Sequence, residues 1–398
     1  MDVNFLGIPL EFYLFGLTLA GVALAHRQAL WVSLAGLAVI LAFKLAGPGG
    51  ATLVGAHFAH GWVLLANLFL LLLGFSVLAN QFELSNAPEA IPGFLPRGWL
   101  GGLVLLALIF MLSIFLDNIA GAVVGGVVAR HAYRGRVSIG FLAAIVAAAN
   151  AGGAGSVIGD TTTTMIWIAG ISPLAVAPAF VGAAAAFAVF GVGGALHQHR
   201  YEPIHPHEGD PVVLDWSRIG IVMAMLVALV ATNIGVAGFA PQLEHLVPAL
   251  GLGLWAAILV TALIRKPDWK VLWPASTGAV FLIALVAAAS LMPVETLPAP
   301  SWQSTFVIGI VAAAFDNIPL TALALQQGGY DWALLAYVVG LGGSSLWFGS
   351  SAGVALTNLF PEGRSSVRWV KEGWYVPVGY VLGFFVMLWV FGWTTARV

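Results

Sequence analysis

Two Asp-Asn pairs are the residues of this chain best suited to chemistry, because each lies in the middle of an apolar stretch: Asp117-Asn118 and Asp316-Asn317. A carboxylate at membrane depth is costly unless it is paired, hydrated or coordinating an ion. Carboxylate and amide oxygens, together with carbonyls at the end of a half-helix, are ligands that hard cations prefer. We therefore predict a sodium site at each pair, with Thr321 nearby. The alternative is a simple helix cap, but a serine would cap without the charge.

Two glycine-rich segments form the second candidate: NAGGAGSVIGDTTTT at 150–164 and GGSSLWFGSSAG at 342–353. This glycine density in an apolar run predicts an unwound helix, which a membrane tolerates only where the backbone is buried or lines a wet cavity. Close helix packing by small residues is the alternative, but it leaves Asn150 and Asp160 unexplained. The candidates for proton or substrate contact are Asn150, Ser156, Asp160, Thr161, Thr162, Ser344, Ser345 and Ser350. The candidate hinge glycines are Gly152, Gly153, Gly155, Gly159, Gly342, Gly343, Gly349 and Gly353.

Asp160 distinguishes the two segments. Aligned at an offset of 190 positions, Gly152 matches Gly342, whereas Asp160 matches Ser350. Only the first segment therefore carries this acid, which we interpret as the group that exchanges protons or contacts substrate. A carboxylate binds either a proton or a cation, depending on its surroundings. Competition between the two for one carboxylate is the simplest mechanism of antiport.

Composition identifies the solvent around these residues. The 398 residues are 60% hydrophobic and 8% charged, with a mean hydropathy of +0.98, whereas soluble domains carry about 25% charged residues. Apolar runs long enough to span a bilayer as helices recur along the chain, which predicts an all-α integral membrane protein rather than a barrel. The net charge of −2 argues against nucleic acid, and the absence of cysteine excludes disulfides and thiolate chemistry. We expect no cofactor other than sodium as the transported or coupling ion.

The motifs recur in the same order, which indicates an internal repeat. We place the first repeat at 1–197 and the second at 216–398, joined by a cytoplasmic linker at 198–215. Simple apolar spans are expected near 6–25, 29–47, 59–80, 173–197, 216–238, 246–265, 271–291 and 374–395. Re-entrant hairpins are expected at about 98–131 and 302–327, and broken helices at about 139–170 and 331–360. Asp117 and Asp316 are 199 positions apart.

The distribution of basic residues favours two inverted repeats of five transmembrane helices over parallel repeats. Inversion requires each Asp-Asn stretch to be a hairpin rather than a crossing. Under that arrangement 13 of the 15 basic residues fall on one side, which is cytoplasmic by the positive-inside rule, and Lys44 and Arg397 remain opposite. Those 13 are Arg27, Arg97, Arg130, Arg134, Arg136, Arg200, Arg218, Arg265, Lys266, Lys270, Arg364, Arg368 and Lys371. Both termini are then extracytoplasmic, in an inner (plasma) membrane.

The motifs FLDNIAG, NAGGAGSVIGDTTTTMIWI and FDNIPLTA resemble those of the ion transporter superfamily, which includes NhaD-type sodium/proton antiporters, citrate and dicarboxylate carriers, and arsenite permeases. The resemblance covers nearly the whole chain. It implies paired opposing hairpins, two unwound helices, a homodimer and elevator-like movement. Sodium/dicarboxylate carriers typically place Ser-Asn-Thr at the hairpin tips, where this chain has Asp-Asn. The difference favours a cation over a dicarboxylate.

Two functions remain in competition. The first is a sodium (or lithium)/proton antiporter that uses Asp117, Asp160 and Asp316. The second is a sodium- or proton-coupled symporter of a small anion, either a carboxylate or an inorganic oxyanion, held by helix N-termini and the hydroxyl run 161–164. We interpret the protein as no enzyme, because Val157-Ile-Gly-Asp160 lacks the Gly-x-Gly-Asp pattern of intramembrane aspartyl proteases. A serine nucleophile at 156 would lack a histidine partner at membrane depth.

Four histidines cluster around the predicted linker. They could bind a metal or sense pH, but their spacing matches no closed zinc site. We therefore interpret them as a solvated group on the cytoplasmic side: His197, His199, His205 and His207.

Overall fold

The computed structural model describes residues 4–5, 8–25, 28–204, 212–239, 243, 246–315 and 317–395. Several residues discussed above therefore lie outside the described part of the chain. They are Arg27, His205, His207, Asp316 and Arg397.

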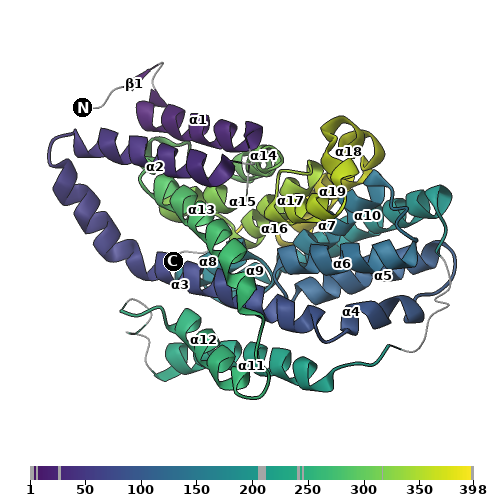
Figure 1. The fold of residues 1–398 in the computed structure, drawn as a ribbon. Helices are drawn as coiled ribbons and strands as arrows, with labels where there is room; N and C mark the ends of the chain where they lie inside the picture. The colour runs from purple at the N-terminus through teal and green to yellow at the C-terminus, as the bar shows by residue number, and fades with distance from the viewer. Residues whose placement is uncertain are drawn as a thin grey trace. The chain divides into compact units, whose positions relative to one another are not determined.

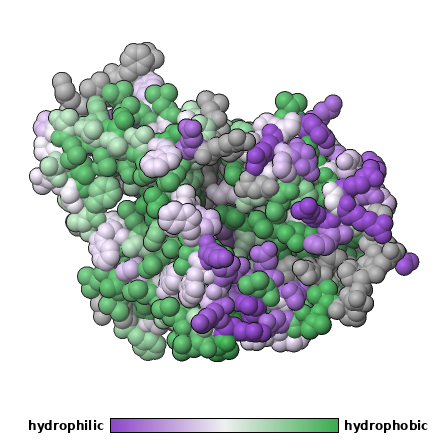
Figure 2. All heavy atoms as spheres, viewed as in Figure 1, coloured by the Kyte–Doolittle hydropathy of each residue, from purple (hydrophilic) through white to green (hydrophobic). Residues whose placement is uncertain are grey.

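The described residues are helical apart from turns and one two-residue strand pair, which confirms the all-α class. The strands β1 (Asn4–Phe5) and β2 (Ile8–Pro9) pair antiparallel. Large apolar side chains lie exposed on the helices, and Trp31 and Trp389 are 71% and 86% exposed. On the face shown in Figure 2, hydrophobic side chains cover much of the surface and hydrophilic ones gather in patches. A surface of this kind suits lipid rather than water.

Three helical segments among the described residues are long and apolar enough to cross a membrane: Gly61–Glu83, Pro173–Tyr201 and Trp269–Ser290. Ser366–Glu372 and Tyr375–Phe391 form a fourth if they are counted as one span, bent by 61°. The other apolar helices are 10–17 residues long, because turns and glycine-rich breaks divide the longer apolar runs. These helices and the composition indicate a multi-pass membrane protein.

The chain forms two compact units, each assembled from separate segments. Unit 1 comprises residues 1–80, 220–299 and 318–328. Most of its residues lie in α1 (Leu10–Leu24), α2 (Ala29–Leu45), α3 (Gly50–Glu83), α11 (Trp216–Phe239), α12 (Ala249–Ala262), η4 (Trp269–Val271), α13 (Leu272–Ser290), η5 (Val294–Thr296) and α15 (Asn317–Gln327). In unit 1, α2 packs against α1 and α13. Asn67 on α3 accepts a hydrogen bond from the Gly251 amide at 3.0 Å, which ties α3 to α12.

Unit 2 comprises residues 81–219, 300–317 and 329–398. Its helices are α4 (Ala87–Ala90), η2 (Ile91–Phe94), α5 (Trp99–Ser113), α6 (Asn118–Ala132), α7 (Ile139–Gly153), α8 (Thr161–Ile168), α9 (Pro173–Val176), α10 (Ala179–Tyr201), α14 (Trp302–Ala312), α16 (Trp332–Gly342), η6 (Gly343–Ser345), α17 (Ser351–Leu359), η7 (Pro361–Arg364), α18 (Ser366–Glu372) and α19 (Tyr375–Phe391). Each unit thus draws on both predicted halves of the chain.

Two helices form the core of unit 2. Every residue of α7 and every residue of α16 is buried. The helix α7 packs against α5, α6 and α10, and α16 packs against α14 and α19; α5, α6 and α7 lie side by side in Figure 1. Both α7 and α16 are apolar on all sides, as expected of a buried helix. They lead directly into the two glycine-rich segments and therefore hold those segments in the interior.

Some predicted boundaries differ from the observed ones. The linker expected at 198–215 begins inside α10, which continues to Tyr201 because Gln198 is buried there. The Gln198 Oε1 accepts the Ser138 amide at 2.8 Å, and its Nε2 donates to the Arg136 carbonyl at 3.0 Å. The polar composition of the segment predicted a loop, whereas these tertiary hydrogen bonds extend the helix.

Asp331 anchors the start of α16. Its Oδ1 caps the helix by accepting the amides of Ala333 and Leu334 at 3.1 and 3.0 Å. Its Oδ2 accepts the Thr394 amide and hydroxyl at 3.1 and 2.9 Å. One buried carboxylate thus satisfies α16 and the segment after α19 together.

Replacing this anchor should destabilise the protein. We expect Asp331→Ala to lower the midpoint of thermal unfolding in detergent, because the loss of an N-cap costs about 1–2 kcal/mol and buried amides lose their acceptor. Asp268→Ala is the matched control, since Asp268 caps the exposed η4 and its loss should have little effect. Equal midpoints for the two variants would contradict the anchoring role.

Candidate functional site

The turn between α5 and α6 presents the first Asp-Asn pair. Asp117 and Asn118 are 8% and 4% exposed. Asp117 occupies the N-cap position of α6, but its side chain makes no capping hydrogen bond. Its Oδ1 is buried without a hydrogen-bond partner among the described residues, and the carboxylate interacts with the backbone amides of Ile119 and Asn118 and with the Thr161 side chain. The start of α6 therefore stabilises this carboxylate only in part, and the oxygen left without a partner calls for a proton or a cation.

The break between α7 and α8 lies where the glycine run predicts it. Asp160 caps the restarting helix, its Oδ1 accepting the Thr162 amide at 3.1 Å. The hydroxyls of Thr163 and Thr164 both donate to the Asp160 carbonyl at 2.9 Å. They are therefore committed to the backbone. The Thr162 Oγ1 is buried without a partner in the described part of the chain, which leaves this hydroxyl available beside Asp160.

Close backbone contacts bring the break and the α5–α6 turn together. The Ser156 hydroxyl donates to the Ile114 carbonyl at 2.5 Å. A Cβ at Gly159 would collide with the Ser113 carbonyl oxygen. Glycine is required there because it alone lets the two backbones approach so closely. The sequence predicted Gly159 as a hinge, and the structure adds that it packs against the end of α5, next to the α5–α6 turn.

The second break, between α16 and α17, repeats this pattern. A Cβ at Gly342 would collide with the Gly309 carbonyl, and one at Gly349 with the Ala313 carbonyl. Ser350 caps α17 by accepting the Gly353 amide at 3.3 Å, as Asp160 caps α8. The two segments therefore share close contacts and caps as well as sequence spacing.

Asn150 joins the two breaks. Its Oδ1 accepts a hydrogen bond from Asn118 Nδ2 at 3.0 Å. Its Nδ2 donates to the hydroxyls of Ser344 and Ser350 at 2.9 and 3.1 Å. All four side chains are buried. Four of the predicted site residues of unit 2 thus form one connected group: Asn118, Asn150, Ser344 and Ser350.

The buried charges of the described residues are all acidic. They are Asp117, Asp160 and Asp331, and no lysine, arginine or histidine among the described residues is buried. Asp331 is the anchor of α16. The other two acids lie at the turn and the break, and no basic side chain in the described part of the chain is buried beside them. Such a site attracts cations and protons rather than anions.

Three further predicted residues lie in α15 and η6. Thr321 is buried in α15, within unit 1. Asn317 is buried at the start of that helix. Ser345 is partly exposed in η6.

Ser113 was missed by the sequence analysis. It is buried at the end of α5, and its Oγ has no partner among the described residues. A Cβ at Gly121 would collide with this oxygen. A single serine at the end of an apolar helix gives no signal in the sequence, so only the fold places it near the Asp117 turn.

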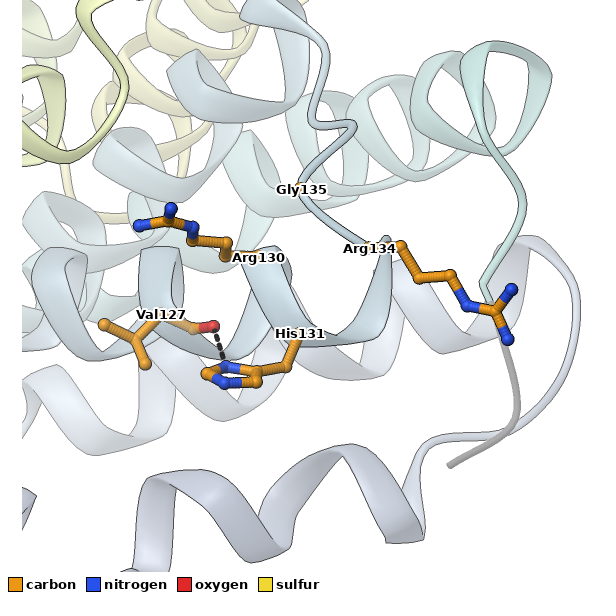
Figure 3. A pocket seen from close by; sticks show the side chains of 5 residues that line it. All are labelled: Val127, Arg130, His131, Arg134 and Gly135. Atoms are coloured by element: carbon orange, nitrogen blue, oxygen red, sulfur yellow. Dashed lines mark hydrogen bonds between the residues drawn. The ribbon is translucent and has the colours of Figure 1, made fainter. Parts of the chain in front are cut away.

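A surface cavity of about 560 Å³ lies at the other end of α6. It is lined by Val127, Arg130, His131, Arg134 and Gly135. Figure 3 shows the side chains of Arg130 and Arg134 extending in opposite directions, while His131 Nδ1 donates to the Val127 carbonyl at 2.9 Å. A cavity lined by bases and without an acid is no place for a cation. We therefore locate the candidate site at the buried acids.

The chain matches no family model, but it is similar to several sodium/proton antiporters. Sodium/proton antiporter 1 of Arabidopsis thaliana is 29% identical over 293 residues, which cover 63% of this chain and 49% of the antiporter. The chain thus spans about half the length of that relative. The Na⁺/H⁺ antiporter NhaD of Alkalimonas amylolytica is 24% identical, with 84% of this chain and 79% of the relative covered. The NhaD of Vibrio parahaemolyticus is 25% identical, with 80% and 88% covered.

These relatives support the resemblance to NhaD-type sodium/proton antiporters that the motifs predicted. The alignments with the two bacterial proteins extend over most of this chain.

The glycine contacts at the break are open to a direct test. We expect Gly159→Ala to destabilise the protein by about 1–3 kcal/mol, because the added methyl group overpacks the contact with Ser113. Gly278→Ala is the control, since Gly278 lies in the helix α13 with no atom within 4 Å of an added Cβ. Thermal unfolding in detergent measures both. A Gly159→Ala variant as stable as Gly278→Ala would refute the close approach.

Proposed function

We propose that this protein is a sodium (or lithium)/proton antiporter. The observation that carries the proposal is the pair of buried acids: Asp117 has an unpartnered Oδ1, and Asp160 lies beside the unpartnered Thr162 hydroxyl. Oxygen ligands of this kind suit a hard cation. The names of the relatives agree with this function.

The exchange follows from competition for the same carboxylates. A protonated carboxyl group releases its proton when sodium binds to its oxygens, and sodium leaves when the group is protonated again. Either ligand offsets the charge that burial makes costly. A site that holds either a proton or a sodium ion, but not both, couples the movement of protons in one direction to the movement of sodium in the other.

An anion symporter fits the site less well. The Thr163 and Thr164 hydroxyls donate to backbone carbonyls, so they are not free to hold an anion. The acids at 117 and 160 would repel one. The search for an anion substrate therefore becomes worthwhile only if cations fail to drive proton movement.

The transport cycle that we propose is alternating access. Two inverted repeats of five transmembrane helices would each supply a re-entrant hairpin and a broken helix. The recurring glycine contacts and caps of the two breaks support such a repeat. We further propose a homodimer in an inner (plasma) membrane, with both termini extracytoplasmic, elevator-like movement of the ion site, and a second tip at Asp316-Asn317.

Transport by purified protein in liposomes tests the function. Adding sodium or lithium chloride should dequench a pH dye by driving proton efflux, and Asp117→Asn and Asp160→Asn should each reduce the rate by about tenfold or more, as expected when a charged ligand is lost. Asp331→Asn is the matched control, because it changes a buried acid but keeps the cap on α16. If no cation produces a response in the wild type, antiport is wrong, and sodium-driven uptake of carboxylates and oxyanions should be measured instead.

A further inference from the structure

The amide group of Asn150 occupies an unusual position between the two breaks. Its Nδ2 lies 2.9 Å from Ser344 Oγ and 3.1 Å from Ser350 Oγ. Asn150, Ser344 and Ser350 are each 0% exposed. Two hydroxyl oxygens therefore converge on one donor group in an interior closed to water. Converging oxygens are also what a cation site needs.

The acceptor capacity of the two serines is largely used by this contact. A hydroxyl oxygen has two lone pairs. Ser350 Oγ accepts one N–H from Asn150 and another from the Gly353 amide at 3.3 Å, so neither lone pair remains for an ion. Ser344 Oγ accepts from Asn150 as well. A cation could bind these hydroxyls only by displacing the amide.

The other break differs at the matching position. Asn150 and Gly340 are 190 positions apart, as are Asp160 and Ser350. Asn150 thus bonds to Ser350, the cap of the second break. The residue that matches Asn150 in the other segment is Gly340, which lies near Asp160, the cap of the first break. A Cβ added to Gly340 would lie 3.5 Å from Asp160 Oδ2. Gly340 therefore has no side chain that could bond to Asp160. At the matching position, the Asn150 side chain donates its amide to Ser350.

We propose that the Asn150 amide takes the place of a cation between Ser344 and Ser350, so that these hydroxyls hold a fixed amide and the transported ion binds beside Asp160. This inference rests on the proposed antiport function. The amide is neutral and covalently attached, so it stabilises the second break without leaving during transport. The hydroxyls of Ser344 and Ser350 are then structural partners of Asn150 and not ligands of the ion.

Equilibrium binding of radioactive sodium to the purified protein in detergent tests the inference. Ser344→Ala removes an oxygen whose described side-chain partner is Asn150, and we expect the sodium affinity to stay within about twofold of wild type. Asp117→Asn is the positive control and should weaken binding by about tenfold or more. A comparable loss in Ser344→Ala would show that this hydroxyl is a ligand and would overturn the inference alone.

A gain of binding provides an independent check. Asn150→Asp has the same shape, but it replaces the donor group with a carboxylate oxygen facing Ser344 and Ser350. Three oxygens then converge where the amide stood, and we expect the number of sodium ions bound per chain to rise by one. An unchanged number would contradict the inference. Wild-type protein that binds no sodium would overturn the proposed function itself, and this inference with it.

Discussion

A buried carboxylate must have its charge offset, and the interior of unit 2 is arranged around that constraint. Asp331 meets the requirement with four hydrogen bonds from α16 and Thr394. Asp117 does not, because one of its oxygens has no partner among the described residues. No buried base among those residues compensates for it. The same side-chain chemistry therefore gives a structural anchor at Asp331, and at Asp117 the group that we propose binds the ion.

Glycine makes this arrangement possible. The α5–α6 turn can approach the first break because Gly152 and Gly159 have no side chain to collide with the carbonyls of Phe110 and Ser113. An interrupted helix exposes backbone groups that hydrocarbon cannot satisfy. The hydroxyls of Ser156, Thr163 and Thr164 bond to backbone carbonyls in and beside the break. The glycines thus allow the backbones to approach closely, and the serine and threonine hydroxyls donate to backbone carbonyls that the interrupted helix leaves free.

The two helix breaks, α7–α8 and α16–α17, have similar backbone geometry but different side chains at matching positions. Both breaks have caps at matching positions, but one cap is the acid Asp160 and the other is the neutral Ser350. Asn150 extends across to the second break, and Gly340 leaves Asp160 to other partners. Two breaks of similar local geometry therefore carry an acid at the cap of one and a neutral hydroxyl at the cap of the other. In the antiport mechanism proposed above, this difference places the negative charge at Asp160, where a proton and a cation would compete for it.

The sequence by itself determined the helical membrane class, the motif repeat and the candidate site residues, because hydropathy, glycine density and acids in apolar runs are local signals. Tertiary structure decided which of those residues meet. Ser113 and Asp331 gave no functional signal, yet one lies by the Asp117 turn and the other fixes α16. The two serine partners of Asn150 lie 194 and 200 positions away in the chain. Contacts over such separations depend on how the helices pack, which local pattern does not encode.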